Sequence, residues 1–302
     1  MVMSMRALVI LGAIVPLAYA DLIPIGPNAG NYAVLYEGTG GHNLQIANVT
    51  ISGNIGVGGA GVVQNNGPST ITGELDFSVA NTAQYHNNNA SNVGPTSVNY
   101  NVSAVTNALN SVNSLNSAYS GGNGLAISGA QTINESAGQL ETVDGVLTRV
   151  FNITSYSETD GMVVAIDGDG SGDPVVFNFA QSLGNVNLKG LVTLTGLTDD
   201  QVLWNFLGSG NNINLNTNDS SFPAQAFHGI ILAPGDVLSM NAANLDGRFF
   251  GGDSADMQIV SHSNLTAPAS TTPVPEPSSV ILLVSVVLFC ATAWARRKSA
   301  RV

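Results

Sequence analysis

Cationic residues and cysteine are scarce in this chain, and both scarcities restrict what it can do. Of its 302 residues only eight are Lys or Arg, against twenty Asp or Glu, and the one cysteine is Cys290. Residues 21–272 hold three cations, Arg149, Lys189 and Arg248, against nineteen acids, which gives this segment a net charge of −16. Binding to nucleic acid needs clustered Lys and Arg that displace counterions, so we expect none. A thiol nucleophile and a disulfide are excluded for the same segment.

Familiar catalytic motifs are also missing. The chain has no Gly-x-Ser-x-Gly nucleophile elbow, and none of its four histidines belongs to a His-x-x-x-His pair. The neighbouring acids Asp199 and Asp200 could serve a glycosidase only if a cleft held two carboxyl groups at a suitable separation. They also fit a turn before a strand. We therefore expect no enzyme, with glycan processing as the catalytic alternative.

The N-terminus has the features of a signal peptide. Arg6 precedes the apolar stretch Ala7–Leu17, and Ala18 and Ala20 form the small-x-small pattern of a cleavage site. We expect residues 1–20 to be removed on export.

The C-terminus carries a second targeting segment. An uncharged apolar run covers residues 278–295, and at 1.5 Å per residue a helix would span roughly 27 Å there, close to a bilayer core. Prolines before the run interrupt any helix, and the cations after it favour a cytoplasmic C-terminus. The residues of the sorting motif are Val274, Pro275, Glu276, Pro277, Arg296, Arg297 and Lys298.

This order of motif, apolar run and basic end resembles the PEP-CTERM sorting signal of Gram-negative bacteria. The resemblance implies that an exosortase-type membrane enzyme recognises and removes residues 274–302. It implies transient anchoring in the inner membrane, and then a location in the envelope, on the outer surface or outside the cell, often alongside exopolysaccharide. An ordinary C-terminal membrane anchor is the alternative.

Short apolar clusters between Gly, Asn, Ser and Thr predict a mainly β domain for residues 21–265, followed by a linker at 266–273. Residues 48–57 alternate with period two around a turn or bulge at Ser52–Gly53. Such short, evenly interrupted strands favour a β-solenoid, with a β-sandwich as the alternative. Later strands are expected at 139–147, 150–153, 162–166, 174–179, 186–194, 202–206, 213–215, 229–232 and 257–260.

One amphipathic helix is predicted at about 101–119. Its apolar residues recur every three or four positions, and Gly121–Gly122 is expected to end it. Its polar face is Asn and Ser, which are poor helix formers, so we expect the apolar stripe to pack on the sheet. The stripe comprises Val102, Val105, Leu109, Val112, Leu115 and Tyr119.

Several motifs of the domain resemble the choice-of-anchor A family. The resemblance implies one domain over most of residues 30–262, joined to the surface by varied anchors, adhesin-like in some members and without an assigned reaction. The Asn-rich loop at 81–101 departs from the family pattern. The matching segments are Asn31–Leu35, Val49–Gly59, Gln201–Leu207, Phe227–Pro234 and the closing turn Leu245–Gly252.

A shorter stretch, Gln64–Leu75, resembles the opening of ice-binding β-solenoids, which also carry one helix alongside their coils. No later flat, Thr-rich face repeats in the sequence. The resemblance implies a solenoid and leaves ice binding as an alternative function.

The loop at 167–173 has the spacing of a calcium site. Asp167, Asp169, Ser171 and Asp173 place oxygen atoms at alternate positions between glycines, as the start of an EF-hand loop does. The twelfth position is Asn178 in place of Glu. The alternative is a plain hairpin turn without a cofactor.

Together these features predict a non-catalytic, exported surface or matrix protein. Its expected roles are adhesion and association with exopolysaccharide, biofilm or surface proteins. The alternative is a carbohydrate- or ice-binding solenoid module.

Overall fold

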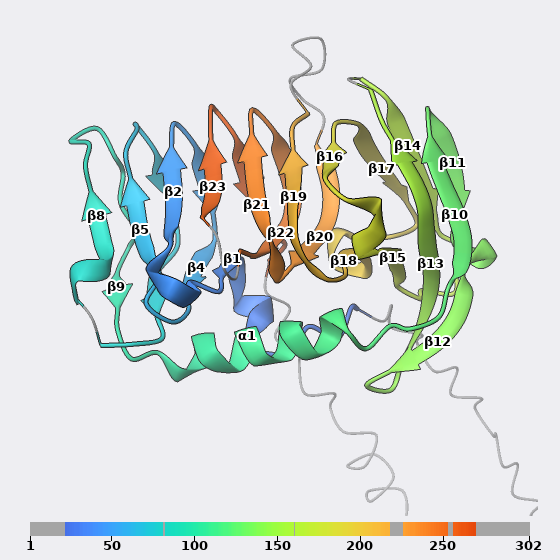
Figure 1. The fold of residues 1–302 in the computed structure, drawn as a ribbon, viewed down its shortest axis with the longest axis horizontal. Helices are drawn as coiled ribbons and strands as arrows, with labels where there is room; N and C mark the ends of the chain where they lie inside the picture. The colour runs from blue at the N-terminus through green and yellow to red at the C-terminus, as the bar shows by residue number, and fades with distance from the viewer. Residues whose placement is uncertain (1–21, 81, 160, 218–225, 253–255, 270–302) are drawn as a thin grey trace, which may run out of the picture. The chain divides into compact units, whose positions relative to one another are not determined.

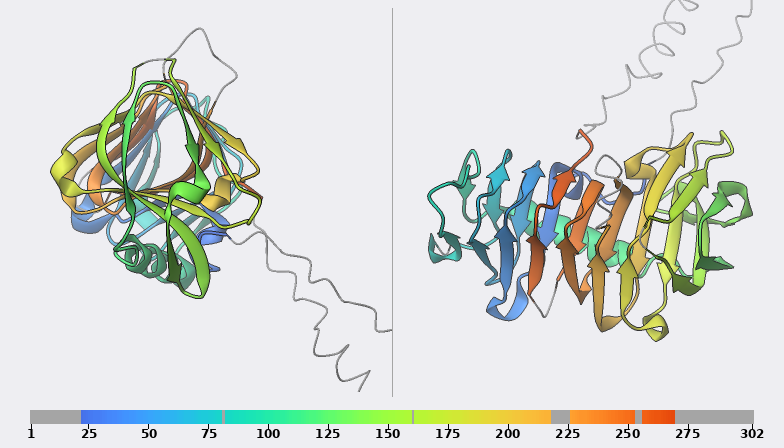
Figure 2. Two further views of the ribbon diagram at one scale, coloured as in Figure 1. Left: turned by 90° about the vertical axis from the view of Figure 1, so that its right-hand side faces the viewer. Right: turned by 90° about the horizontal axis from the view of Figure 1, so that it is seen from above.

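The described part of the chain coils into a three-sided solenoid of short strands (Figures 1 and 2). The computed structural model describes residues 22–80, 82–159, 161–217, 226–252 and 256–269. The expected signal peptide and the expected sorting motif with its apolar run lie outside these residues. Among the described residues, no helix is both long and apolar enough to cross a membrane.

The solenoid has a helix side, an open side and a third side. The helix side is the sheet β10 (Asn123–Ser128), β13 (Val146–Ser157), β15 (Val175–Phe179), β18 (Val202–Phe206), β20 (Phe227–Ala233), β22 (Asn244–Gly251), β1 (Tyr32–Tyr36), β4 (Asn54–Val57), β7 (Leu75–Phe77) and β9 (Val98–Asn99). The open side is the seven-stranded sheet β16 (Val186–Leu188), β19 (Ser209–Leu215), β21 (Gly235–Asn241), β23 (Met257–Val260), β2 (Asn43–Ala47), β5 (Val62–Asn65) and β8 (Tyr85–Asn87). The third side comprises β11 (Gln131–Asn134), β14 (Val163–Asp167) and β17 (Leu191–Thr195), together with β24 (Asn264–Thr266), β3 (Thr50–Ser52) and β6 (Thr70–Ile71).

Successive strands visit the three sides in turn. β1, β2 and β3 form one coil, and β4, β5 and β6 form the next, each strand pairing in parallel with its counterpart. The expected turn at Ser52–Gly53 is the corner between β3 and β4. Gly53 has φ 135°, and a Cβ there would lie 2.8 Å from the Cβ of Ala33, so the corner requires glycine.

The mainly β prediction is confirmed, and the strand pairing is that of a solenoid. Every named strand pair in the described residues is parallel except that of β12 (Gln139–Val143) with β13. A sandwich would have antiparallel sheets. The single strand expected at 139–147 is wrong. Asp144 and Gly145 have positive φ and turn the chain there, so that β12 and β13 form a hairpin.

Two expected turns are also different in the structure. The loop at 167–173 does not close a hairpin, because β14 before it lies on the third side and β15 after it lies on the helix side. The segment Leu245–Gly252 is largely the strand β22, which pairs with β20 and β1.

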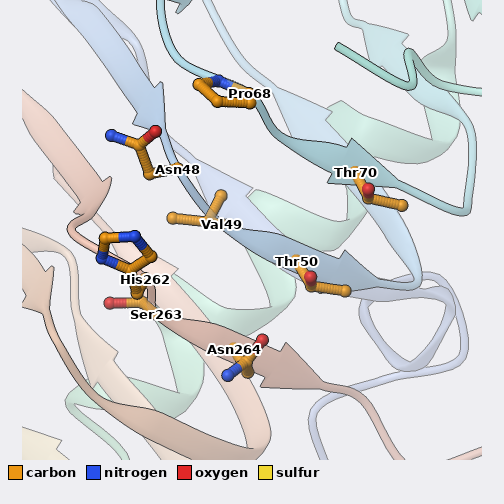
Figure 3. A pocket seen from close by; sticks show the side chains of 8 residues that line it. All are labelled: Asn48, Val49, Thr50, Pro68, Thr70, His262, Ser263 and Asn264. Atoms are coloured by element: carbon orange, nitrogen blue, oxygen red, sulfur yellow. The ribbon is translucent and has the colours of Figure 1, made fainter. Parts of the chain in front are cut away.

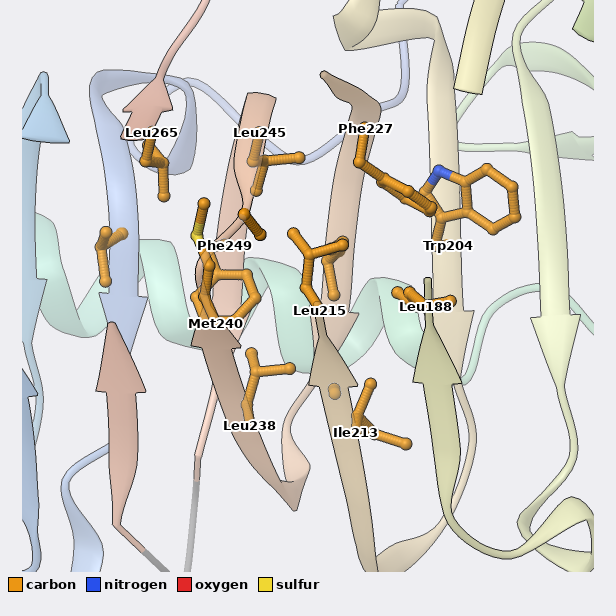
Figure 4. Close-up of a cluster of buried hydrophobic side chains, with 14 of the residues drawn as sticks. Leu188, Trp204, Ile213, Leu215, Phe227, Leu238, Met240, Leu245, Phe249 and Leu265 are labelled. Atoms are coloured by element: carbon orange, nitrogen blue, oxygen red, sulfur yellow. The ribbon is translucent and has the colours of Figure 1, made fainter. Parts of the chain in front are cut away.

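Inward-pointing apolar side chains from all three sides fill the solenoid (Figure 4). Aromatic rings stack along the helix side, with Phe177 4.7 Å from Trp204 between ring centroids, and Phe179 4.5 Å from Phe206. The Nε1 of Trp204 donates to the carbonyl of His228 at 2.9 Å, so this buried ring leaves no unpaired donor. The stacked rings rigidify the coils that carry the surface side chains.

The expected helix is α1 (Ser103–Asn116), and it runs along the helix side (Figures 1 and 2). Its buried residues Val105, Val112 and Leu115 belong to a second core with outward-pointing sheet residues such as Leu203 and Phe250. Core packing of the stripe is therefore confirmed.

Helix α1 ends at Asn116, earlier than Gly121–Gly122 suggested. The Nδ2 of Asn116 donates to Oδ1 of Asn205 at 2.7 Å and to the carbonyl of Phe206 at 2.9 Å. Asn205 donates in turn to the carbonyl of Asn116 at 3.0 Å and to Oδ1 of Asn178 at 2.8 Å. These contacts to the sheet fix the last turn of the helix in place.

Candidate functional site

The open side carries one unbroken row of polar side chains, which we call the polar file. Each strand of the seven-stranded sheet contributes one residue, and each neighbouring pair is in direct register. Because strands in a sheet lie about 4.8 Å apart, the file offers polar groups at that interval. In order across the sheet the file is Asn187, Asn214, Ser239, Gln258, Gln45, Gln64 and His86.

The polar file contains no Asp, Glu, Lys or Arg, and hydrogen bonds hold its ends. Asn214 donates to Asn187 at 3.0 Å, and the Ser239 hydroxyl donates to Asn214. At the other end Asn88 donates to Gln64 at 3.1 Å. In the middle, no side-chain hydrogen bond joins Gln45 or Gln258 to any described residue, so their amides are available to a ligand.

Apolar residues lie beside the polar file on the same surface. Val62 is in register with Asn43, and Val237 with Asn212. Asn212 is exposed and the other three are partly exposed. The surface beside the polar file therefore offers small apolar side chains as well as hydrogen-bonding groups. No helix covers this sheet in Figure 1 or Figure 2.

A hollow of about 390 Å³ lies on the third side, next to the corner with the open side (Figure 3). Three turns build it: the one from β2 to β3, the one from β5 to β6 and the one from β23 to β24. Its lining residues are Asn48, Val49, Thr50, Pro68, Thr70, His262, Ser263 and Asn264.

The two acids weighed for glycan hydrolysis contact different basic side chains. Asp199 accepts a 2.7 Å contact from Nδ1 of His228, while Asp200 binds buried Arg248 at 2.9 Å. The hydrogen bond with Asp199 raises the pKa of His228 above its ordinary value. Burial raises the pKa of Asp246, the register partner of His228. Each acid is thus paired with a basic side chain of β20 or β22.

The loop weighed for calcium is organised by Arg149. Its guanidinium lies 3.6 Å from Asp169 and 3.3 Å from Asp173, and Ser171 donates its hydroxyl to Glu135 at 2.8 Å. Arg149 thereby supplies the positive charge that a calcium ion would bring.

The hydrogen bond from the backbone amide of Ser171, at 2.8 Å, holds the pKa of Asp169 below its usual range. Asp167 lies at the end of β14, paired with Thr195 and Asn134. Among the described residues, no group of three or more His, Cys, Asp or Glu is placed to hold a metal. Calcium binding stays a prediction.

Comparison with known proteins gives a family and a fold. The model of the ice-binding-like adhesive domain family matches residues 23–258. No curated protein matches the chain.

Two crystal structures illustrate the fold. One is the ice-binding protein of the Antarctic ascomycete Antarctomyces psychrotrophicus, with 16% identity, a TM-score of 0.51 and coverage of 82% of this chain and 100% of that one. The other is an ice-binding protein from an Antarctic biological consortium, with 15% identity, a TM-score of 0.51 and coverage of 89% and 97%. At this identity the likeness concerns the fold. The choice-of-anchor A and PEP-CTERM resemblances stay predictions.

Proposed function

This chain belongs to the family of ice-binding-like adhesive domains, and from that premise we propose that it is a non-catalytic binding module. Its ligand is an extended surface of repeating hydroxyl groups or ordered water, as a polysaccharide or ice presents. The observation that carries the proposal is the polar file, one uncharged polar residue per strand on the uncovered open side.

A rigid, regular surface suits such a ligand. Parallel strands fix the spacing of the file, and the stacked core beneath it holds those strands, so little backbone order has to be gained on binding. Amide groups both donate and accept, which matches hydroxyl groups and water equally well. The acidic net charge of residues 21–272 disfavours anionic polymers.

The test compares two surfaces and two variants. The purified protein is mixed with cellulose or chitin particles in one arm and with a slowly growing ice front in the other. We expect retention in at least one arm. Gln258→Tyr, which places a ring in the middle of the polar file, should abolish that retention.

The matched control is Thr193→Tyr, at an exposed position of the third side. It should bind as the unchanged protein does. Retention in neither arm, or equal loss in both variants, would contradict the proposal. The arm that retains the protein identifies which of the two surfaces it binds.

The proposed location is outside the inner membrane of a Gram-negative bacterium. The signal peptide and the PEP-CTERM-like tail support export and processing by an exosortase-type enzyme, and an adhesive domain is suited to the cell surface. Replacing Pro275, Glu276 and Pro277 by alanine should leave the protein in the inner-membrane fraction of an exosortase-containing host. Unchanged release of that variant would argue against the sorting signal.

A further inference from the structure

The hollow on the third side has polar walls. The fold uses the hydroxyl of Ser263, which donates to the carbonyl of Val260 at 2.6 Å, but leaves several other polar groups without a partner among the described residues. Thr50 is in register with Thr70 on one side and with Asn264 on the other, so three polar side chains stand in a row across it. No hydrogen bond joins the hydroxyls of Thr50 and Thr70, or the imidazole of His262, to another described residue. The Nδ2 of Asn264 donates to Oδ1 of Asn244 at 2.9 Å, and its side-chain carbonyl can still accept a hydrogen bond from a ligand.

Flat, less polar surfaces complete the hollow. Figure 3 shows His262 and Pro68 at its rim and Val49 between them at its floor. Rings of this kind can pack against the C–H face of a sugar ring, while hydroxyls and amides bind its edge. A row of polar groups beside flat rings is therefore suited to a small carbohydrate.

The turns hold this rim in an unfavourable backbone conformation. Asn48, Ser261 and His262 have φ of 57°, 60° and 65°, in the left-handed region that non-glycine residues seldom adopt. The amide of His262 donates to the carbonyl of Asn48 at 2.6 Å, and that of Ser261 to the carbonyl of Ala47 at 3.1 Å. The structure maintains His262 at the rim although glycine would fit the backbone more easily.

The charge of the lining decides which sugar it suits. None of the lining residues is Asp, Glu, Lys or Arg. An acidic sugar would find no cation, and the acidic chain would repel it. From the row of polar side chains, the rings at the rim and the absence of charged lining residues, we infer that the hollow binds one unit of a neutral glycan. This site is separate from the polar file and does not depend on it.

The test is direct binding of soluble sugars to the purified protein. Saturation-transfer NMR with glucose, galactose, mannose, N-acetylglucosamine and glucuronate should show contact with at least one neutral sugar and none with glucuronate. Thr50→Val with Thr70→Val removes two hydroxyls while keeping the side-chain shape, and should weaken the Kd about tenfold, as loss of one to two hydrogen bonds would. His262→Gly should weaken it as well without loss of fold, because glycine suits φ 65°.

The polar-file variant Gln258→Tyr distinguishes this inference from the proposed function. It should bind soluble sugars unchanged while losing retention on particles or ice. Failure of every neutral sugar to bind would overturn the inference, and so would unchanged binding by both the double variant and His262→Gly. Far-ultraviolet circular dichroism confirms that each variant is folded.

Discussion

Arg248 of β22 and Asp200, which lies just before β18, form a buried ion pair on the helix side. The Nε of Arg248 lies 2.9 Å from Oδ1 of Asp200, and its Nη1 donates to the carbonyl of Tyr32 at 2.7 Å. Arg248 is 1% exposed. One of the three cations in residues 21–272 is thus committed to the core.

Removing one partner of this pair should destabilise the protein strongly. Arg248→Met leaves the Asp200 carboxylate and the Tyr32 carbonyl without their donor, so we expect a loss of about 3–5 kcal/mol in the free energy of unfolding. Urea denaturation measures it. The control is the double variant Arg248→Met with Asp200→Leu, which removes both charges and should recover much of the loss. A double variant as unstable as the single one would show that the pair matters through shape alone.

Asn205 should be required to dock the end of helix α1. It is fully buried and exchanges hydrogen bonds with Asn116 and Asn178. Asn205→Leu leaves the Nδ2 of Asn116 and the Oδ1 of Asn178 without this partner, which should cost about 1–3 kcal/mol. Hydrogen exchange should speed up in residues 112–116 first. Uniform exchange changes over the whole solenoid would contradict a local docking role.

Gly247 should tolerate no side chain. It faces Gly229 across β20 and β22, and a Cβ at Gly247 would lie 1.8 Å from the Gly229 carbonyl oxygen. Gly247→Ala must push the two strands apart and should cost about 3 kcal/mol or more. Gly30→Ala is the control, since nothing lies within 4 Å of a Cβ there. Thermal denaturation of both variants decides, and equal melting temperatures would refute the steric argument.

His228 should make stability depend on pH above the usual imidazole range. Its folded pKa is raised by Asp199, so its contribution is complete below the unfolded pKa of about 6.5 and is lost as pH rises through the folded pKa. Burial also raises the pKa of Asp246, so the free energy of unfolding falls as pH rises from the unfolded Asp pKa of about 3.9 through the folded one. The test therefore compares the melting temperature of the unchanged protein with that of His228→Gln at each pH. The difference in melting temperature should shrink from pH 6 to pH 9, and a constant difference would exclude titration of His228.

Local sequence patterns predicted a good part of this fold. Apolar spacing located helix α1, and short apolar clusters between Gly, Asn, Ser and Thr predicted the short strands of a solenoid. The end of α1 could not be predicted, because Asn116 is held by Asn205, distant in sequence. Neither could the side on which each strand lies, since a corner and a hairpin use the same turn residues.

The candidate sites were harder to predict, because they depend on register between distant strands. Gln45 and Gln258 are neighbours only because β23 pairs with β2. A lone Gln in a short strand carries no signal of its own. The hollow was missed for a similar reason, since Thr50 and His262 come from opposite ends of the domain.

The position of β22 and β23 has a consequence for biogenesis. β22 lies between β20 and β1, and β23 between β21 and β2, so two strands near the C-terminal end of the domain connect the first coils to the rest of the solenoid. Until residues 244–260 have emerged, the early coils have an unpaired edge and the solenoid is incomplete. A solenoid closed in this way reaches its final form only after nearly the whole domain has been synthesised, so its folding depends on pairing between strands far apart in the sequence.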